Sequence, residues 1–127
     1  IARKYDLNNR LHSMWQDQVW RRRAVELANI SKDDAIVDVA CGTGDLAIAF
    51  CKAGASKVLG IDFTKAMLDL AVTKSEIIGL PIEYRQGNAV DLHLEDESAN
   101  IVSIAFGISN GRIATLFPGR YFVTGTI

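Results

Sequence analysis

The sequence feature that most constrains the fold is a glycine-punctuated turn between a strand-like run and a helix-like run. The apolar run 35–39 contains one acidic residue, Asp38, and the turn follows it directly. Gly42 and Gly44 lie in the hexapeptide 42–47, which fits the G-x-G-x-x-G/A fingerprint of nucleotide-binding βαβ units. Small residues in this pattern let backbone N–H groups approach a ligand closely. One match to the fingerprint is weak support, so the surrounding sequence decides its meaning.

A second strand-like run ends in a carboxylate at the spacing that a nucleotide site requires. Residues 57–62 end at Asp62, 18 residues after Gly44. An acidic residue about 20 positions beyond the glycines accepts hydrogen bonds from ribose hydroxyls. Two simpler interpretations stay open: Asp62 only caps the following helix, or the glycine turn holds no ligand. We expect strand, turn, helix, strand and acid to form one mononucleotide-binding unit.

Asp38 distinguishes between two nucleotide cofactors. In dinucleotide-binding turns the residues before the glycines are normally apolar, whereas here a carboxylate precedes Gly42 by four residues. Because an unpaired buried carboxylate is costly, we expect a cationic ligand group beside it. S-adenosyl-L-methionine carries an ammonium, a sulfonium and a ribose. The sequence therefore predicts S-adenosyl-L-methionine in preference to NAD.

The predicted site is a clamp for this cofactor, with no metal ligand and no identified catalytic residue. Methyl transfer from a sulfonium depends mainly on positioning and desolvation, so a clamp is the constellation that the reaction needs. We expect Asp38 at the methionine amino end, Asp62 at the ribose hydroxyls and Asn88 at the adenine edge. The turn residues 42–44 would provide close backbone approach, and Thr43 would add a hydroxyl.

The remaining pattern predicts a doubly wound, Rossmann-like α/β fold in which helices cover a mainly parallel sheet. In the helix that begins after Thr64, we expect a buried face made of Met67, Leu70, Ala71 and Ile77/Ile78. We expect one or two helices in 5–29, a helix from the glycine turn to Gly54, and a helix that begins after Thr64 and ends at Gly79. The expected strands are 35–39, 57–62, 82–86 and 100–106.

Composition and charge limit the function classes. The 127 residues carry a net charge of −1, which argues against a general nucleic-acid binder. Residues 1–30 hold six basic and three acidic residues, and the rest hold eight and 12. The basic run Arg21–Arg23 indicates a solvated face or, as the sharper alternative, contact with an anionic membrane surface. Two cysteines fit no disulfide framework, and the longest uncharged run, 98–111, is too short to span a bilayer. We expect a cytoplasmic protein with an optional peripheral contact at the inner membrane face.

Several stretches together resemble the ubiquinone/menaquinone biosynthesis C-methyltransferases, a family of class I S-adenosylmethionine-dependent enzymes. The N-terminal signature and the glycine motif make the resemblance specific, since the glycine motif alone would indicate only a methyltransferase. The resemblance covers about residues 2–110. Its stretches are Tyr5–Asn9 with Ser13 and Trp20, Val37–Leu46, Gly87–Ala89 and Phe106–Asn110.

The resemblance implies methylation of a ring carbon on a polyprenylated quinol, such as a demethylmenaquinol or a ubiquinol precursor. By matching position, it implies that Thr43, Asp62, Asn88 and Ala89 contact the cofactor. Carbon methylation is helped by a base that removes a phenolic proton. The sequence does not identify this base; His12 is a candidate by chemistry but matches no family motif.

Departures from the family pattern limit these implications. A serine that the family uses near the cofactor falls at Ala105, and an arginine falls at Ser109. After Asn110 the likeness ends, although 116–123 is similar to the family's next turn and strand with the intervening helix deleted. We expect one domain, with a helical substrate-side segment at 1–30, a core at 31–110 and a divergent tail at 111–127. The alternatives are a methyltransferase with another small-molecule substrate, or a non-catalytic fragment that binds the cofactor.

Overall fold

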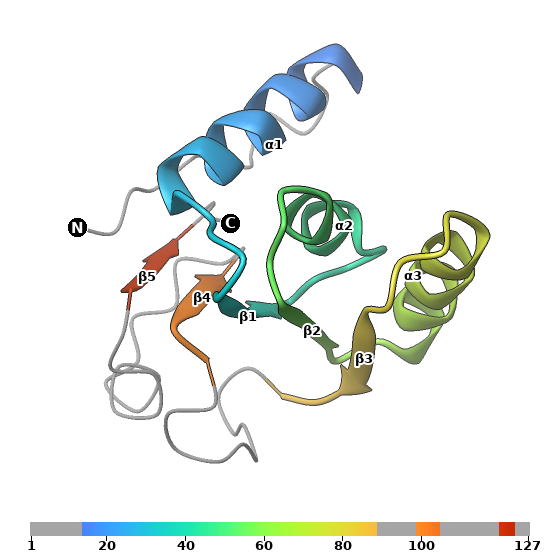
Figure 1. Cartoon of the computed structure of the whole chain (residues 1–127). Helices are drawn as coiled ribbons and strands as arrows, with labels where there is room; N and C mark the ends of the chain where they lie inside the picture. The colour runs from blue at the N-terminus through green and yellow to red at the C-terminus, as the bar shows by residue number, and fades with distance from the viewer. Residues whose placement is uncertain (1–13, 89–98, 105–119, 124–127) are drawn as a thin grey trace.

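A parallel five-stranded sheet forms the centre of the protein, as the computed structural model shows (Figure 1). The structure describes residues 14–88, 99–104 and 120–123. Strands and helices alternate along the first part of the chain, so the predicted α/β fold with a parallel sheet is confirmed. The elements are α1 Met14–Ala28, β1 Ala35–Val39, α2 Asp45–Lys52, β2 Lys57–Asp62, α3 Lys65–Ile77, β3 Glu83–Gln86, β4 Ile101–Ile104 and β5 Arg120–Val123.

The strand order, β3-β2-β1-β4-β5, creates a place for a ligand. The chain moves outward from β1 through β2 to β3 and then returns to the other side of β1 for β4 and β5. The order therefore reverses between β1 and β4, and ligands of open α/β sheets bind outside the carboxyl ends of the strands at such a reversal. In this register Asp38 of β1 lies opposite Gly60 of β2 and Ser103 of β4.

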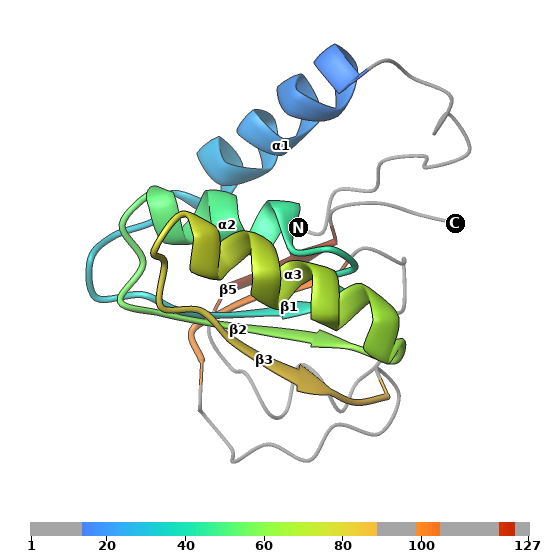
Figure 2. The same cartoon turned by 90° about the vertical axis from the view of Figure 1, so that its right-hand side faces the viewer.

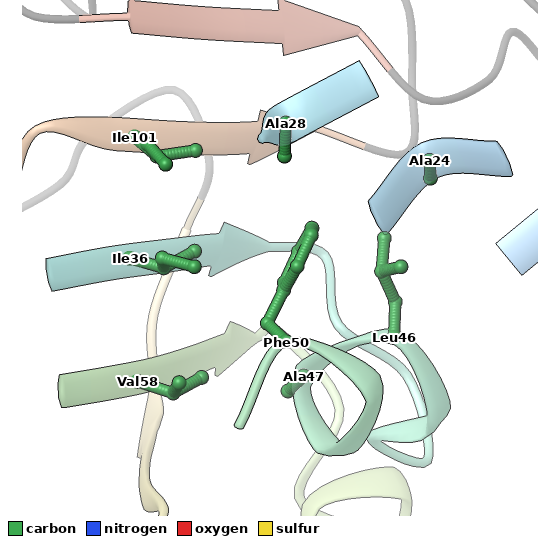
Figure 3. Close-up of a cluster of buried hydrophobic side chains, with 8 residues drawn as sticks. All are labelled: Ala24, Ala28, Ile36, Leu46, Ala47, Phe50, Val58 and Ile101. Carbon is green, nitrogen blue, oxygen red and sulfur yellow. The ribbon is translucent and has the colours of Figure 1, made fainter. Parts of the chain in front are cut away.

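The described helices cover one face of the sheet (Figure 2). α2 and α3 lie on the strands, and the end of α1 packs beside α2 on the β4 side of the sheet (Figure 1). Phe50 of α2 is fully buried and lies next to Ala28 of α1 (Figure 3). A doubly wound fold has a further helix layer on the other face, and the described residues place no helix there. The cluster of buried apolar side chains comprises Ala24, Ala28, Ile36, Leu46, Ala47, Phe50, Val58 and Ile101.

At the amino-terminal edge of the sheet, Asp34 and Asn100 hold the starts of three strands together. The Asp34 carboxylate accepts hydrogen bonds from the Ser31 backbone N–H at 2.8 Å and from the Asn100 side-chain amide. The Asn100 side-chain oxygen accepts the Ala35 N–H at 2.7 Å, and the Asp34 carbonyl accepts the Ser56 N–H at 2.8 Å. This network is remote from the glycine turn, so it stabilises the fold without contacting the site.

The predicted buried face of α3 is largely wrong. Ala71 is buried as expected, but Met67 and Leu70 are 43% and 56% exposed, and Ile77 and Ile78 are exposed as well. The residues that pack toward β2 and β3 are instead Leu68, Ala71 and Ser75. The cause is the composition of the helix: apolar residues surround most of its circumference, so their periodicity does not select one face.

The predicted strands at 82–86 and 100–106 form as Glu83–Gln86 and Ile101–Ile104, and residues 105 and 106 lie outside the described part. The tail contributes β5, which pairs in parallel with β4 from Ile101↔Arg120 to Ile104↔Val123. The similarity of 116–123 to a family strand thus corresponds to a strand in the structure.

Candidate cofactor-binding site

The glycine turn is a tightly constrained segment that connects β1 to α2. Ala40, Gly42 and Gly44 all have positive φ, at 60°, 58° and 88°. A left-handed conformation at a non-glycine residue costs roughly 1–2 kcal/mol, so Ala40 is held there by its surroundings. The turn is fixed to β2 by the Cys41 N–H, which donates to the Ile61 carbonyl at 2.9 Å. The bond to β2 therefore helps to hold the turn in a conformation that is strained at Ala40.

Asp62 joins the end of β2 to the glycine turn. One carboxylate oxygen accepts the Gly42 N–H at 2.7 Å, and the other accepts the Thr64 N–H at 2.9 Å, at the start of α3. This second bond reaches the N-cap residue that precedes α3, so among the described contacts Asp62 shapes the turn before the helix and does not cap an N–H inside it. Each oxygen has a further lone pair, so the same carboxylate can also accept hydrogen bonds from the hydroxyls of a ligand.

Asp38 is a buried carboxylate with an oxygen that nothing in the described residues satisfies. Its side chain is 1% exposed, and its Oδ2 has no hydrogen-bond partner among those residues. Successive strand residues alternate between faces, so Asp38 points to the same face as Ile36, toward the helices. Beside it in the register, the buried Ser103 hydroxyl likewise lacks a partner of conventional geometry in the described part of the chain.

The electrostatics of this position favour a cation. Burial raises the pKa of Asp38 to about 7; the neighbouring Ser103 hydroxyl opposes the rise, and the charge of Asp62 adds to it. Burial, together with the charges of both carboxylates, also raises the pKa of the Cys41 thiol well above its usual value, so this cysteine stays protonated and is a poor nucleophile. A Cβ placed on Gly42 would meet no described atom within 4 Å, so there is open space at the turn. A buried carboxylate whose Oδ2 has no partner among the described residues, beside an open glycine turn, fits a ligand with an ammonium or sulfonium group.

Tyr84 of β3 packs against the inner side of the turn. Its hydroxyl and the Ser75 hydroxyl of α3 share a 2.8 Å hydrogen bond. A Cβ on Gly44 would lie 2.6 Å from the Tyr84 Oη, and one on Gly60 would lie 2.7 Å from its Cδ1 and 3.0 Å from the Cys41 Sγ. The ring therefore occupies space that side chains at these two glycines would need, which explains why both positions are glycine.

Charged side chains from three helices meet at the first turn of α2. The Lys74 Nζ of α3 donates to the Thr43 hydroxyl at 3.2 Å and forms an ion pair with Asp45. Arg21 of α1 lies 3.8 Å from the other Asp45 oxygen. Arg22 and Arg23 are exposed.

The end of β3 lies beside Asp62. The Gly87 N–H donates to the Asp62 carbonyl at 3.0 Å, which brings Asn88 to the same sheet edge, where its side chain is exposed. Phe63 lies next to Asp62 with 73% of its surface exposed, and its carbonyl accepts the Gln86 side-chain amide at 3.0 Å.

The structure thus brings six of the seven predicted site residues to one edge, and Ala89 and the candidate base His12 lie outside the described residues. The sequence interpretation missed Phe63, Lys74, Tyr84 and Ser103. Phe63 could have been found as the exposed aromatic neighbour of Asp62. The other three have no local signal, because they meet the turn only after folding. In the described segments no group of three or more His, Cys, Asp or Glu side chains is arranged to hold a metal ion.

Solved structures with this architecture define the fold class. A structure of a putative S-adenosyl-L-methionine-dependent methyltransferase from Methanococcus maripaludis superimposes with a TM-score of 0.72 at 20% identity, covering 83% of this chain and 53% of that one. The YcgJ protein from Bacillus subtilis gives 0.71 at 22% identity, covering 79% and 46%. The chain has the class I S-adenosylmethionine-dependent methyltransferase fold in part.

Sequence comparison then gives the family: the chain belongs to the ubiE/COQ5 methyltransferase family, which matches residues 1–114. A demethylmenaquinone methyltransferase from Thermus thermophilus is 43% identical over 111 residues, covering 87% of this chain and 50% of the relative. A ubiquinone/menaquinone biosynthesis C-methyltransferase, UbiE, from Bdellovibrio bacteriovorus is 39% identical over 111 residues, covering 87% and 47%. The chain spans about half the length of these relatives. Among the described helices, none is long and apolar enough to cross a membrane.

Proposed function

We propose that this chain is the cofactor-binding half of an S-adenosyl-L-methionine-dependent methyltransferase. The observation that carries the proposal is the buried Asp38 oxygen without a described partner, located below an open glycine turn. A dinucleotide would offer no cation to this carboxylate at the turn. The ammonium and sulfonium of S-adenosyl-L-methionine would, and family membership supports the same cofactor.

Each polar group at the sheet edge has a complementary part of this cofactor. Asp38 would lie at the cationic methionine end, the turn from Gly42 to Gly44 would pack against the ligand through its backbone, and Asp62 would accept the ribose hydroxyls. Asn88 would contact the adenine edge, and Ala89, which the resemblance matches to a cofactor contact, lies outside the described residues. The exposed Phe63 ring would cover a face of the base, where an aromatic side chain contributes both apolar contact and stacking.

When bound, the cofactor supplies an activated methyl group on a sulfonium. The protein residues would contribute position and exclusion of water, since transfer of a methyl group needs the acceptor held in line with it. The turn from Ala40 to Gly44 suits this role because the hydrogen bond of Cys41 to β2 fixes its position relative to the sheet. The buried position of Asp38 strengthens its attraction for the cationic end, since charges interact more strongly away from water.

For the acceptor, we propose a ring carbon of a polyprenylated quinol, either a demethylmenaquinol or a polyprenyl benzoquinol. The support is the resemblance of the N-terminal signature and the names of the relatives, which are demethylmenaquinone and ubiquinone/menaquinone biosynthesis methyltransferases. A peripheral membrane contact through the basic N-terminal segment would bring the enzyme to such a substrate.

Calorimetric titration of S-adenosyl-L-methionine into the purified chain tests the cofactor, with NADH as the control. We expect binding in the micromolar range, roughly −8 kcal/mol, and none by NADH. Binding of NADH without S-adenosyl-L-methionine would refute the proposal and favour an oxidoreductase.

A second candidate is a non-catalytic fragment that binds the cofactor, and the observation in its favour is that the chain spans about half of its relatives. Transfer of a labelled methyl group from S-adenosyl-L-methionine to a demethylmenaquinol extract distinguishes the two. Methylated quinol would support the enzyme, whereas binding without turnover would support the fragment.

A further inference from the structure

Lys74 connects α3 to the glycine turn through a side chain that the sequence pattern did not single out. Its ammonium donates to the Thr43 hydroxyl at 3.2 Å across a separation of 31 residues, and it also pairs with Asp45. Asp45 is in turn approached by Arg21 at 3.8 Å. The Lys74 side chain is 38% exposed, so it reaches the turn from a partly open position.

The direction of this hydrogen bond determines that the Thr43 hydroxyl can act as a donor to a further group. A lysine ammonium carries three donors and no acceptor, so the Thr43 oxygen must be the acceptor in this pair. The hydroxyl hydrogen then points away from Lys74 and is available to donate to another group. A donor polarised by a neighbouring cation forms its strongest hydrogen bond with an anion.

Charged groups of both signs surround the turn. Lys74 and Arg21 with Asp45 give one positive charge in excess beside Thr43, whereas Asp38 and Asp62 are acidic groups close enough to affect each other. The methionine end of S-adenosyl-L-methionine is a zwitterion, with an ammonium and a carboxylate on the same carbon. Such a group would align with its ammonium toward Asp38 and its carboxylate toward Thr43.

We propose that Lys74 is a positioning residue that orients the Thr43 hydroxyl as a donor to the carboxylate of the bound cofactor's methionine end. This inference rests on the proposed function, because it assigns a part of the same cofactor to a residue of the same site. Asp45 holds the lysine in place through their ion pair, and Arg21 adds positive charge near Thr43.

The test compares three ligands that differ in the methionine end. S-adenosyl-L-methionine and S-adenosylhomocysteine carry the carboxylate, whereas 5′-methylthioadenosine lacks the whole amino-acid end. Calorimetry on the full chain should show that Lys74→Met weakens the binding of the first two ligands by roughly five- to 30-fold. The affinity for 5′-methylthioadenosine should change by less than about twofold. Lys65→Met is the matched control, because Lys65 pairs only with Asp69 of its own helix among the described contacts, at 3.0 Å.

Two further variants keep the test informative if Lys74→Met folds poorly. Lys74→Arg preserves the charge and the donors, so it should recover most of the affinity for S-adenosylhomocysteine. Thr43→Val removes the hydroxyl without removing the ion pair, so it should also weaken the binding of the two ligands that carry the carboxylate. The double variant should bind them only slightly more weakly than either single variant does.

The possible results distinguish a failure of the role of Lys74 from a failure of the proposed cofactor-binding function. Suppose that the wild-type chain binds all three ligands and that Lys74→Met lowers their affinities equally or not at all. Either result would overturn the role of Lys74 and leave the proposed function standing. Failure of the folded wild-type chain to bind S-adenosyl-L-methionine would overturn the proposed function and this inference together.

Discussion

The carboxylate of Asp38 links stability to pH in a direction opposite to that of a salt-bridged acid. Its pKa rises from 3.8 to about 7 on folding, so between these values the folded chain retains a proton that the unfolded chain has released. Raising the pH therefore favours unfolding until about pH 7, above which the effect levels off.

Asp38→Asn should remove this dependence. We expect its free energy of unfolding, relative to that of the wild type, to increase by up to about 1.4 kcal/mol per pH unit between pH 5 and 7. Urea denaturation at several pH values measures it. Ser103→Ala removes the hydroxyl that opposes the shift, so it should move the end of the slope to higher pH. Parallel profiles for wild type and Asp38→Asn would contradict the prediction.

Asp62 accepts the backbone N–H groups of Gly42 and Thr64, and under the proposed function it would also accept the ribose hydroxyls of the cofactor. Asp62→Ala should weaken S-adenosyl-L-methionine binding by about 10- to 100-fold, since a hydrogen bond to a charged group contributes roughly 1.5–3 kcal/mol. Calorimetry measures this, with Asp69→Ala, an exposed carboxylate on α3, as the control. Unchanged binding in Asp62→Ala would remove this residue from the site.

At the scale of elements, the Tyr84 ring of β3 fills the space beside Gly60 of β2 and Gly44 of the glycine turn. Gly60→Ala should destabilise the protein by about 1–3 kcal/mol, because the new Cβ would lie 2.7 Å from the Tyr84 ring. The cause is steric, so the cost should be smaller when Gly60→Ala is introduced into a Tyr84→Ala background. Thermal unfolding of the four proteins measures the coupling. Additive effects would show that Tyr84 is not the obstacle.

At the scale of the whole molecule, the site depends on three strands at once. Residues from the carboxyl ends of β1 and β2 and from the segment after β3 would all contact one ligand, so binding should stabilise the sheet as a unit. S-adenosylhomocysteine at 100 times its dissociation constant should add about 2.7 kcal/mol and raise the melting temperature by about 10 °C. NADH at the same concentration is the control, and an equal shift with NADH would contradict a specific site.

The sequence by itself determined the order of the elements and which polar residues lie at the carboxyl edge of the sheet. The alternation of apolar runs with glycine turns is local information, and acids at strand ends must meet at one edge when the strands are parallel. Family motifs added the class of protein. For these reasons the sequence alone singles out Asp38, the glycine turn and Asp62.

Only the tertiary structure decided which face of α3 is buried and which distant side chains support the turn. Met67 and Leu70 are as apolar as Leu68, so the choice depends on how the helix meets β2 and β3. Tyr84 and Lys74 reach the turn from other elements, and the burial that raises the pKa of Asp38 exists only once the strands and helices have assembled. Packing and desolvation depend on contacts between residues far apart in the chain, and local sequence patterns carry little information about such contacts.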